Sequence, residues 1–329
     1  LVATDEIGRE DFFHICFALG KALEDRKEYD EAFWYYQRGN VVRRGFLKYD
    51  GDHIQQQADA QKAFFSESKT RALQSRNSGS PVPIFIVGLP RAGSTLLEQI
   101  LASHSQVEGT QELPDIISIA RRLAGPDPAE AILKYPFALE EMSKEQRLAL
   151  GEEYLERTAP HRTGAAYFID KMPNNFMHVG MIRMILPQAI IVDARRNPMD
   201  CCLSGYKQLF ARGQNFSYSL TEIGRYYATY VDLMRHWDSV FPGQIIRVLN
   251  EDVIEDPERE IRRLLDRCGL PFEEACLYFH RTKRAVKTAS SEQVREPVNS
   301  KGFGRWRFYE RHLDPLKDAL GPVLESYRS

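Results

Sequence analysis

The sequence of 329 residues lacks the apolar run of roughly 20 residues that a membrane-spanning helix needs. It also lacks a secretory signal, because Asp5, Glu6 and Arg9 interrupt any apolar segment near its start. The first residue is Leu and not Met, so we expect a trimmed piece of a longer protein. From these absences we predict a cytoplasmic protein with no transmembrane segment.

Cysteine is scarce, with five residues and therefore an odd number. They are Cys16, Cys201, Cys202, Cys268 and Cys276, and their spacing matches no metal-ligand pattern. We therefore expect buried thiols in a reducing compartment, with neither a disulfide framework nor a bound metal.

An excess of charge of one sign is also missing, since the net charge is −2. The chain has no general basic field, which argues against nucleic acid as a partner. Any anion-binding site must therefore come from a local arrangement of Arg and Lys. Hydrophobic residues make up 43% and charged residues 27%, values typical of a globular protein. The length of 329 residues is enough for one large domain and a small one.

The first part of the chain has helical patterning throughout. Two helices with apolar faces are joined by a turn at 26–28, and a third, polar helix is expected over 52–76. The segment 77–83 is rich in Ser, Gly and Pro, as expected of a linker. We therefore predict an all-helical domain over 1–77 and a second domain over 78–329.

The two N-terminal helices resemble one tetratricopeptide repeat. Small and large residues fall at the packing positions of that repeat, namely Leu19, Gly20, Leu23, Tyr29, Ala32, Tyr36 and Gly39. A stable solenoid needs about three repeats, so a single unit must pack on the neighbouring domain or on further repeats. A generic helical hairpin is the alternative.

A strand, a turn and a helix are predicted in succession after this region. Apolar, β-branched residues over 84–87 indicate a buried strand, and 94–102 has the apolar spacing of a helix. The turn between them contains Gly88 and Gly93. Such a unit presents backbone N–H groups and a positive dipole end to an anion, so it predicts a phosphate site. A Gly/Pro turn before an ordinary helix would show the same pattern.

The loop departs from a nucleotide-hydrolysing P-loop at one position. The spacing from Gly88 to Gly93 is that of a P-loop, but Ser94 stands where such a loop needs the Lys that reaches the β- and γ-phosphates. The cation lies inside the loop instead, at Arg91. The loop is therefore suited to holding a phosphate and poorly suited to hydrolysing ATP.

Strands alternate with helices along the rest of the chain. Strands are expected over 167–170, 189–193 and 245–248, helices over 197–210, 222–237 and 256–268, and a largely helical insert over 113–159. This alternation predicts an α/β fold, with a P-loop-type parallel sheet flanked by helices that follows the N-terminal all-helical, tetratricopeptide-like segment. In such sheets ligands bind beyond the carboxyl ends of the strands, which is where the candidate residues lie.

The segment 89–95, Leu-Pro-Arg-Ala-Gly-Ser-Thr, resembles the 5′-phosphosulfate loop of sulfotransferases. That loop grips the 5′-phosphate of 3′-phosphoadenosine-5′-phosphosulfate (PAPS), which implies this role for Arg91, Ala92, Gly93, Ser94 and Thr95. The segment 290–299 resembles the S-T-D-Q-V-x-K-P-V-N run of the tyrosylprotein sulfotransferases, which implies that Ser290 donates a hydrogen bond near the 5′ side. With the helical repeat in front, the chain looks most like bacterial tetratricopeptide-repeat sulfotransferases.

The resemblance implies two catalytic side chains besides Arg91. Glu112 follows Arg91 by 21 residues, as the catalytic Glu does in the tyrosylprotein enzymes, and is identified as the general base. Lys171 matches the lysine of the family's Lys-x-Pro segment, which bridges the sulfuryl group and the leaving oxygen. Glu108 is the nearest alternative base, and Glu112 could instead open the helix that begins at Leu113. The His base of cytosolic sulfotransferases has no counterpart after Lys171.

For the 3′-phosphate, the resemblance implies Arg196 and Ser204, a pair that both groups of sulfotransferases use. Eight residues separate them, just over two helical turns, so Ser204 lies on a helix face that Arg196 can reach. In the tail, Lys301 and Arg305 are alternative cations for this phosphate, and Gly302 belongs to the same segment.

The sequence departs from the family at two points. Asn250 stands where a Tyr usually follows the last strand, and Gln208 stands where a further Arg is usual. Contacts to adenosine or to the 3′-phosphate are therefore in doubt at these positions. Arg195 is an alternative to Arg196.

We predict an enzyme that transfers the sulfuryl group of PAPS to a hydroxyl and releases adenosine 3′,5′-bisphosphate. The acceptor is a tyrosine or other phenol, a glycan or another hydroxyl-bearing molecule, and the tyrosylprotein-like segments favour a peptide or protein. No metal is required, because Arg and Lys can stabilise the leaving phosphate. The alternatives are a nucleotide-binding helical-repeat adaptor without chemistry and a P-loop kinase.

Overall fold

A computed structural model describes residues 8–73, 79, 81–127, 131–282, 293–300 and 302–328. The chain divides into two compact units. Unit 1 contains 1–54, 197–231 and 301–329, and unit 2 contains 55–196 and 232–300. The N-terminal helices therefore share a unit with the tail of the chain, far away in the sequence.

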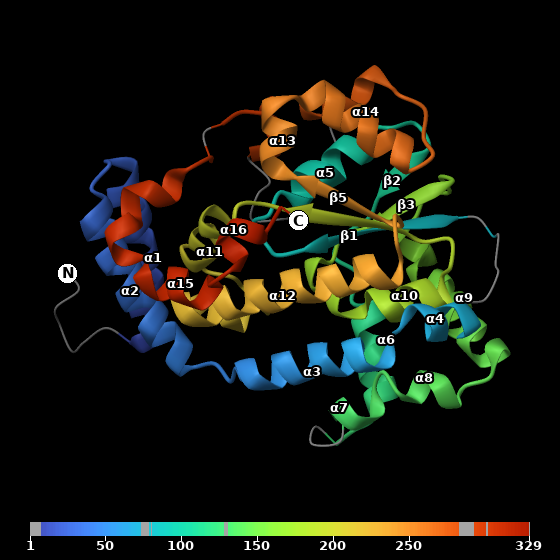
Figure 1. The fold of residues 1–329 in the computed structure, drawn as a ribbon. Helices are drawn as coiled ribbons and strands as arrows, with labels where there is room; N and C mark the ends of the chain where they lie inside the picture. The colour runs from blue at the N-terminus through green and yellow to red at the C-terminus, as the bar shows by residue number, and fades with distance from the viewer. Residues whose placement is uncertain are drawn as a thin grey trace. The chain divides into compact units, whose positions relative to one another are not determined.

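Helices make up most of the described residues (Figure 1). The α-helices are α1 (Arg9–Asp25), α2 (Tyr29–Gly45), α3 (Gly51–Phe64), α4 (Glu67–Leu73), α5 (Ser94–Leu101), α6 (Asp115–Ala124), α7 (Ala131–Lys134), α8 (Ala138–Glu141), α9 (Lys144–Thr158), α10 (Val179–Ile185), α11 (Pro198–Tyr206), α12 (Leu220–Val240), α13 (Asn250–Glu255), α14 (Pro257–Arg267), α15 (Asp314–Leu320) and α16 (Val323–Ser326). The 3-10 segments are η1 (Ala159–His161), η2 (Pro173–His178), η3 (Asn215–Tyr218), η4 (Glu274–Cys276), η5 (Phe279–Arg281), η6 (Gln293–Arg295) and η7 (Arg305–His312). The strands are β1 (Val82–Gly88), β2 (Val107–Gly109), β3 (Tyr167–Asp170), β4 (Ile190–Arg195) and β5 (Ile245–Leu249).

The five strands form one parallel sheet in unit 2, in the order β2–β3–β1–β4–β5. The four predicted strands are confirmed as β1, β3, β4 and β5, with small differences at their ends. β2 was not predicted, because it has three residues and its Glu108 and Gly109 break the apolar, β-branched pattern. The prediction of an α/β fold with a parallel sheet flanked by helices is confirmed.

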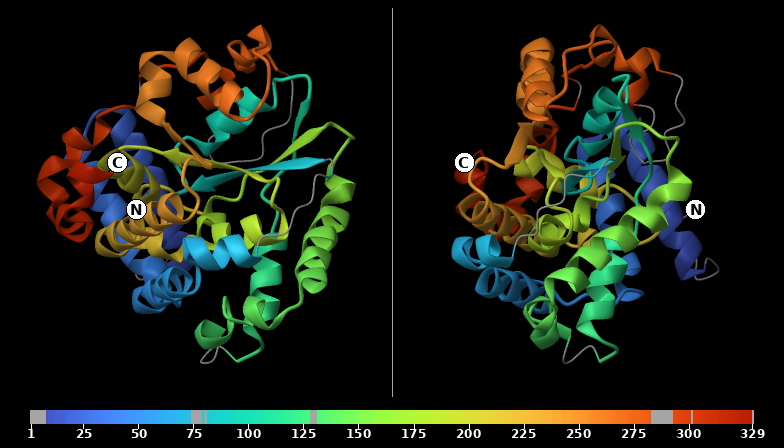
Figure 2. Two further views of the ribbon diagram at one scale, coloured as in Figure 1. Left: turned by 45° about the vertical axis from the view of Figure 1, so that its right-hand side comes forward. Right: turned by 90° about the vertical axis from the view of Figure 1, so that its right-hand side faces the viewer.

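Helices cover both faces of the sheet (Figures 1 and 2). On one face, Leu97 of α5 and Leu264 of α14 are buried in a cluster with Ile86 of β1. On the other face, the ring of Tyr154 in α9 lies 5.6 Å from that of Phe85. Neighbouring residues of β1 thus point to opposite faces, which explains why a strand buried on both sides is apolar without alternation.

The N-terminal region differs from the prediction in two respects. The hairpin of α1 and α2 turns at 26–28 as expected, but the single helix predicted over 52–76 is wrong, because the chain breaks into α3 and α4. Ser66 explains the break, since its Oγ accepts from the N–H of Lys69 at 3.2 Å and caps the start of α4. The predicted linker 77–83 also ends early, because β1 begins within it.

All five cysteines are buried as free thiols, which confirms the expected burial. Among the described residues, none of the helices combines the length and the hydrophobicity of a membrane span. The helix expected over 197–210 ends sooner, at Tyr206, and α13 was not predicted.

Candidate functional site

The carboxyl edge of the sheet has a polar residue or a loop after every strand. β1 leads into the loop that begins at Gly88, and Glu112, Lys171, Arg196 and Asn250 follow β2, β3, β4 and β5. Because the strands are parallel, these positions share one edge. The connections that leave the neighbouring strands β1 and β4 run to opposite sides of the sheet. This is the switch point at which such sheets bind ligands.

The loop after β1 requires glycine at both ends. Gly88 has a φ of 142°, and a Cβ there would lie 2.4 Å from the carbonyl oxygen of Ala194 in β4. Gly93 has a φ of 100°, and a Cβ there would lie 2.6 Å from Oδ1 of Asn250. Between them, Arg91 adopts a left-handed φ of 73°, a strained conformation for a residue with a side chain. Close contacts with β4 and with the residue after β5 therefore constrain the loop.

The loop leads directly into the N-terminus of α5. Ser94 and Thr95 form the start of this helix, and both are buried. The N–H groups in the first turn of a helix have no intrahelical acceptor and carry the positive end of its dipole. Ala92 is also buried, and its N–H donates to the carbonyl of Leu89 at 3.2 Å. Residues 91–95 therefore form a tight turn and helix start of the kind that binds anions.

Two adjacent arginines at the end of β4 have different environments. The Nη1 of Arg196 donates to the carbonyl oxygen of Arg91 in the loop at 3.1 Å, and the side chain is half-buried. Arg195 is completely buried, and its Nη2 lies 2.7 Å from Oδ2 of Asp193. Of the two, only Arg196 combines a contact to the loop after β1 with partial exposure to solvent.

Glu112 and Lys171 form an ion pair between Oε1 and Nζ. The side chain of Lys171 is 3% exposed, whereas that of Glu112 is 50% exposed. The hydroxyl of Thr110 donates to the carbonyl of Ile169 at 2.6 Å, which fixes the chain after β2 to the end of β3. The carboxylate therefore faces solvent while the ammonium group is inside the protein.

Glu108, the alternative base, is engaged elsewhere. Its carboxylate accepts hydrogen bonds from the N–H and the hydroxyl of Thr163 and from the N–H of Gly164. Burial works to raise the pKa of Glu108, but these hydrogen bonds outweigh burial and hold the pKa below its ordinary value. Glu108 therefore stabilises the loop before β3, and Glu112 is the carboxylate beside Lys171.

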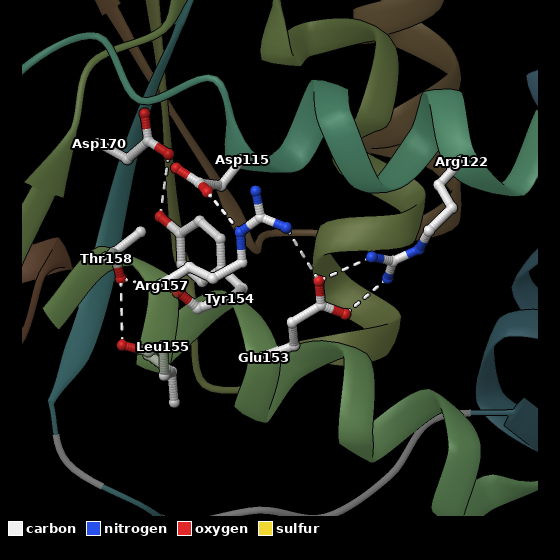
Figure 3. A network of polar contacts seen from close by, with 8 residues as sticks. All are labelled: Asp115, Arg122, Glu153, Tyr154, Leu155, Arg157, Thr158 and Asp170. Carbon is white, nitrogen blue, oxygen red and sulfur yellow. Dashed lines mark hydrogen bonds and ion pairs between the residues drawn. The ribbon is translucent and has the colours of Figure 1, made fainter.

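A polar network supports the segments on both sides of the ion pair (Figure 3). The hydroxyl of Tyr154, in α9, donates to Oδ2 of Asp170 at 2.9 Å. In the same helix, Arg157 donates to Oδ1 of Asp115 at 3.1 Å and to Oε1 of Glu153 at 3.2 Å. Helix α9 thereby holds Asp170 at the end of β3 and Asp115 at the start of α6.

Both anchored residues are close to the ion pair in the sequence. Asp170 immediately precedes Lys171, and Asp115 is three residues after Glu112. Burial raises the pKa of Asp170 to about 8, although its hydrogen bond from Tyr154 acts in the opposite direction. The sequence analysis did not predict this network. The only sequence signal for it is Asp170 itself, an acidic residue at the end of the apolar strand β3.

Two histidines of unit 2, His104 and His178, have structural contacts. Nε2 of His104 lies 2.9 Å from the carbonyl of Pro271, and its Nδ1 accepts from the N–H of Gln106 at 3.1 Å. Nδ1 of His178 lies 2.9 Å from the hydroxyl of Tyr135, and burial lowers the pKa of His178 to about 4. Within the described ranges, no group of three or more His, Cys, Asp or Glu side chains is placed to hold a metal ion.

Three of the predicted nucleotide-binding residues that the structure describes belong to unit 1. Ser204 is half-buried on α11, and Gly302 is exposed in the tail. Arg305 begins η7, and its Nη2 lies 2.9 Å from Oε1 of Glu24 on α1. The ion pair with Glu24 was not predicted, because a Glu on a helix is expected to be exposed.

The predicted residues thus fall into groups. The loop, Arg196 and the Glu112–Lys171 pair share the carboxyl edge of the sheet in unit 2, whereas Ser204, Gly302 and Arg305 are in unit 1. Ser290 and Lys301 lie outside the described residues.

Comparison with known proteins finds similar sequences and a similar structure. The model of the Sulfotransferase family matches residues 83–274. An uncharacterized protein of Aquifex aeolicus is 35% identical over 329 residues, which cover 95% of this chain and 43% of that protein. Protein-tyrosine sulfotransferase A of Caenorhabditis elegans is 21% identical over 283 residues, which cover 83% of this chain and 71% of that protein. The solved sulfotransferase domain of the Synechococcus PCC 7002 olefin synthase has a TM-score of 0.49 and 22% identity, covering 71% of this chain and 90% of that chain.

The chain spans less than half of the length of its Aquifex relative. The family match itself covers more than half of the chain and includes the loop after β1, the five strands except for Val82 and the residues that follow the strands. The chain therefore belongs to the sulfotransferase family.

Proposed function

We propose that this sulfotransferase takes its sulfuryl group from PAPS and transfers it to a hydroxyl. The turn 91–95 and the first turn of α5 bind the 5′-phosphate, with Arg91 as the neighbouring cation. Arg196 binds the 3′-phosphate, because its guanidinium is next to the loop and Arg195 is committed to Asp193. A planar guanidinium with two parallel N–H donors suits a phosphate.

The Glu112–Lys171 ion pair is the observation that carries this proposal. Glu112 takes the proton of the acceptor hydroxyl, and the oxygen then attacks sulfur in line with its bond to the 5′-phosphate. That S–O bond breaks, and its electron pair stays on the phosphate oxygen. Lys171 stabilises the growing negative charge there, and adenosine 3′,5′-bisphosphate leaves. The half-exposed carboxylate of Glu112 suits a base that contacts the acceptor from solvent. The buried ammonium group of Lys171 suits a cation that contacts the sulfuryl donor.

The other proposed ligands rest on the resemblance of sequence. Ser204, Arg305 and Gly302 of unit 1 are proposed for the 3′-phosphate, together with Lys301. Ser290 is proposed as a hydrogen-bond donor near the 5′ side.

The proposed acceptor is a tyrosine in a peptide or protein. The support is the similarity to a relative that is named a protein-tyrosine sulfotransferase, together with the tail segment 290–299. A glycan and a small phenol carry the same reacting hydroxyl and belong in the same assay.

We also propose that α1 and α2 are one tetratricopeptide-like repeat. Ala32 and Tyr36 of α2 are both buried, as such repeats require. A Cβ at Gly20 would lie 2.8 Å from the ring of Tyr36, so the helices approach closely at a small residue. The domain boundary near residue 77 stays a prediction.

Binding and turnover of the wild-type chain test the proposed function. Calorimetry should detect binding of adenosine 3′,5′-bisphosphate to the protein, and ATP should compete poorly for the same site. Sulfur-labelled PAPS should then transfer its label to a tyrosine peptide, a small phenol or an oligosaccharide. Binding without transfer to any acceptor would favour the adaptor, and strong competition by ATP would favour a kinase.

Glu112→Gln tests the base. The amide can still accept a hydrogen bond from Lys171 but cannot take a proton, so we expect turnover to fall by about 100-fold or more. The affinity for adenosine 3′,5′-bisphosphate should stay close to that of the wild type. Glu108→Gln is the matched control and should keep its turnover. Equal loss of turnover and affinity in Glu112→Gln would remove Glu112 as the base.

A further inference from the structure

Two buried carboxylates of unit 1 hold Arg305 and its neighbours in the chain, Glu24 through the head group of Arg305 and Asp200 through the adjoining backbone. The guanidinium Nη2 of Arg305 lies 2.9 Å from Oε1 of Glu24. The neighbours of Arg305 in the chain, Gly304 and Trp306, donate their backbone N–H groups to Asp200 at 2.7 and 3.2 Å. Both the backbone and the head group of Arg305 are therefore fixed.

Glu24 lies on α1, in the N-terminal hairpin, and is 7% exposed. Its carboxylate also accepts from Nζ of Lys207 at 2.8 and 2.9 Å and from the hydroxyl of Tyr36 at 3.1 Å. Burial works to raise the pKa of Glu24, but Lys207, Arg305 and Tyr36 together hold it below its ordinary value. Glu24 is therefore ionised in the folded protein and is a fixed point for two cations.

Asp200 connects the tail with the helix that carries Ser204. Asp200 is in the first turn of α11, and Ser204 follows four residues later on the same helix face. The tail also packs on the N-terminal hairpin, where the rings of Tyr29 and Phe308 stack at 4.6 Å. The surroundings of Arg305 thus come from α1, α11 and the tail.

We propose that Glu24 is a positioning residue for the nucleotide, which orients Arg305 so that its other N–H groups meet the 3′-phosphate. This rests on the proposed function, in which Arg305 is a ligand of that phosphate. A guanidinium carries five N–H donors, so one contact to Glu24 leaves several for an anion. The long Arg side chain also loses its rotamer freedom on folding and not on binding, which favours affinity.

Charge alone predicts the opposite effect. The cluster contains two cations, Lys207 and Arg305, and one carboxylate, Glu24. If Glu24 only masked the cations, removal of its charge would strengthen phosphate binding. If Glu24 positions Arg305, the same change weakens binding.

The experiment compares two nucleotides that differ only in the 3′-phosphate. Calorimetry measures the Kd of adenosine 3′,5′-bisphosphate and of adenosine 5′-phosphate for the wild type and for Glu24→Gln. We expect Glu24→Gln to bind the bisphosphate about tenfold more weakly and the 5′-phosphate equally well. Asp25→Asn is the matched control, because Asp25 is the next carboxylate on α1, is exposed and pairs with Lys21. It should leave both affinities unchanged.

Arg305→Ala shows whether Glu24 acts through Arg305. This variant should lose at least as much affinity for the bisphosphate as Glu24→Gln. The double variant should lose no more than Arg305→Ala alone, because the two residues then act as one unit. Additive losses would mean that Glu24 does not act through Arg305, and would overturn the inference.

The outcomes separate the inference from the proposed function. A wild type that binds both nucleotides equally, or neither, refutes the proposed function. An Arg305→Ala variant that still prefers the bisphosphate removes Arg305 from the 3′-phosphate site. A Glu24→Gln variant that binds the bisphosphate as tightly as the wild type, or more tightly, overturns the positioning role while the proposed function stands.

If Glu24→Gln unfolds and binds neither nucleotide, Glu24→Asp tests the inference instead. The shorter side chain keeps the negative charge that Lys207 needs but draws the carboxylate away from Arg305 by one methylene group. With thermal unfolding as a check of the fold, this variant should weaken only the bisphosphate. Unchanged bisphosphate binding in a folded Glu24→Asp would overturn the inference.

Discussion

Asp170→Asn should change how the stability of the protein depends on pH. Burial raises the pKa of Asp170 to about 8 in the folded state, against an ordinary value of 3.8. The folded state therefore holds a proton that the unfolded state releases. The stability from this group is fully present below pH 3.8 and is lost as the pH rises through 8.

The magnitude follows from the distance between the two pKa values. Within that window, each pH unit changes the free energy of unfolding by about 1.4 kcal/mol for one group. Between about pH 5 and about pH 7.5, the wild type should therefore lose about 3 kcal/mol relative to Asp170→Asn. This is a large part of the roughly 5–15 kcal/mol by which a protein is stable.

Urea unfolding at the two pH values, followed by circular dichroism, measures this difference. The Asn side chain can still accept the hydrogen bond from Tyr154, so the variant removes the titration and keeps the contact. Asp266→Asn, at an exposed position on α14, is the control and should follow the wild type at both pH values. If the wild type and Asp170→Asn change in parallel, Asp170 is not protonated in the folded state and the reasoning is wrong.

Further substitutions test the loop and the two arginines. Gly88→Ala should destabilise the protein by about 3 kcal/mol or more, because the added Cβ would lie 2.4 Å from the carbonyl oxygen of Ala194; a melting temperature like that of the wild type would contradict this. Arg195→Ala should cost about 3–5 kcal/mol of stability, since it leaves Asp193 buried without its nearest cation, as thermal unfolding would report. Arg196→Ala should instead weaken binding of adenosine 3′,5′-bisphosphate by about tenfold with little change in melting temperature. Equal losses of stability in both arginine variants would refute this division of roles.

Local sequence patterns predicted most of the sheet and the glycine turn after β1. A strand buried on both faces needs an apolar run, and the runs that became β1, β3, β4 and β5 were visible for that reason. The glycines at 88 and 93 were likewise visible, because a turn of positive φ selects glycine. β2 was hidden, since three residues cannot show a pattern.

The sequence also supplied, through the family resemblance, the candidates Glu112, Lys171 and Arg196. It did not show that the alternative candidates, Glu108 and Arg195, have other partners in the fold. By residue type, Glu108 is equivalent to Glu112 and Arg195 to Arg196. Only the fold shows that Glu108 accepts a hydrogen bond from Thr163 and that Arg195 is buried.

Which charged groups are buried, and with which partners, depended on how distant segments fold together. Lys171 meets Glu112 across 59 residues of chain, and Lys207 meets Glu24 across 183. Helical and strand patterns arise from residues that are close in the sequence. The burial of a charge depends on partners brought from distant segments, and no local pattern specifies them.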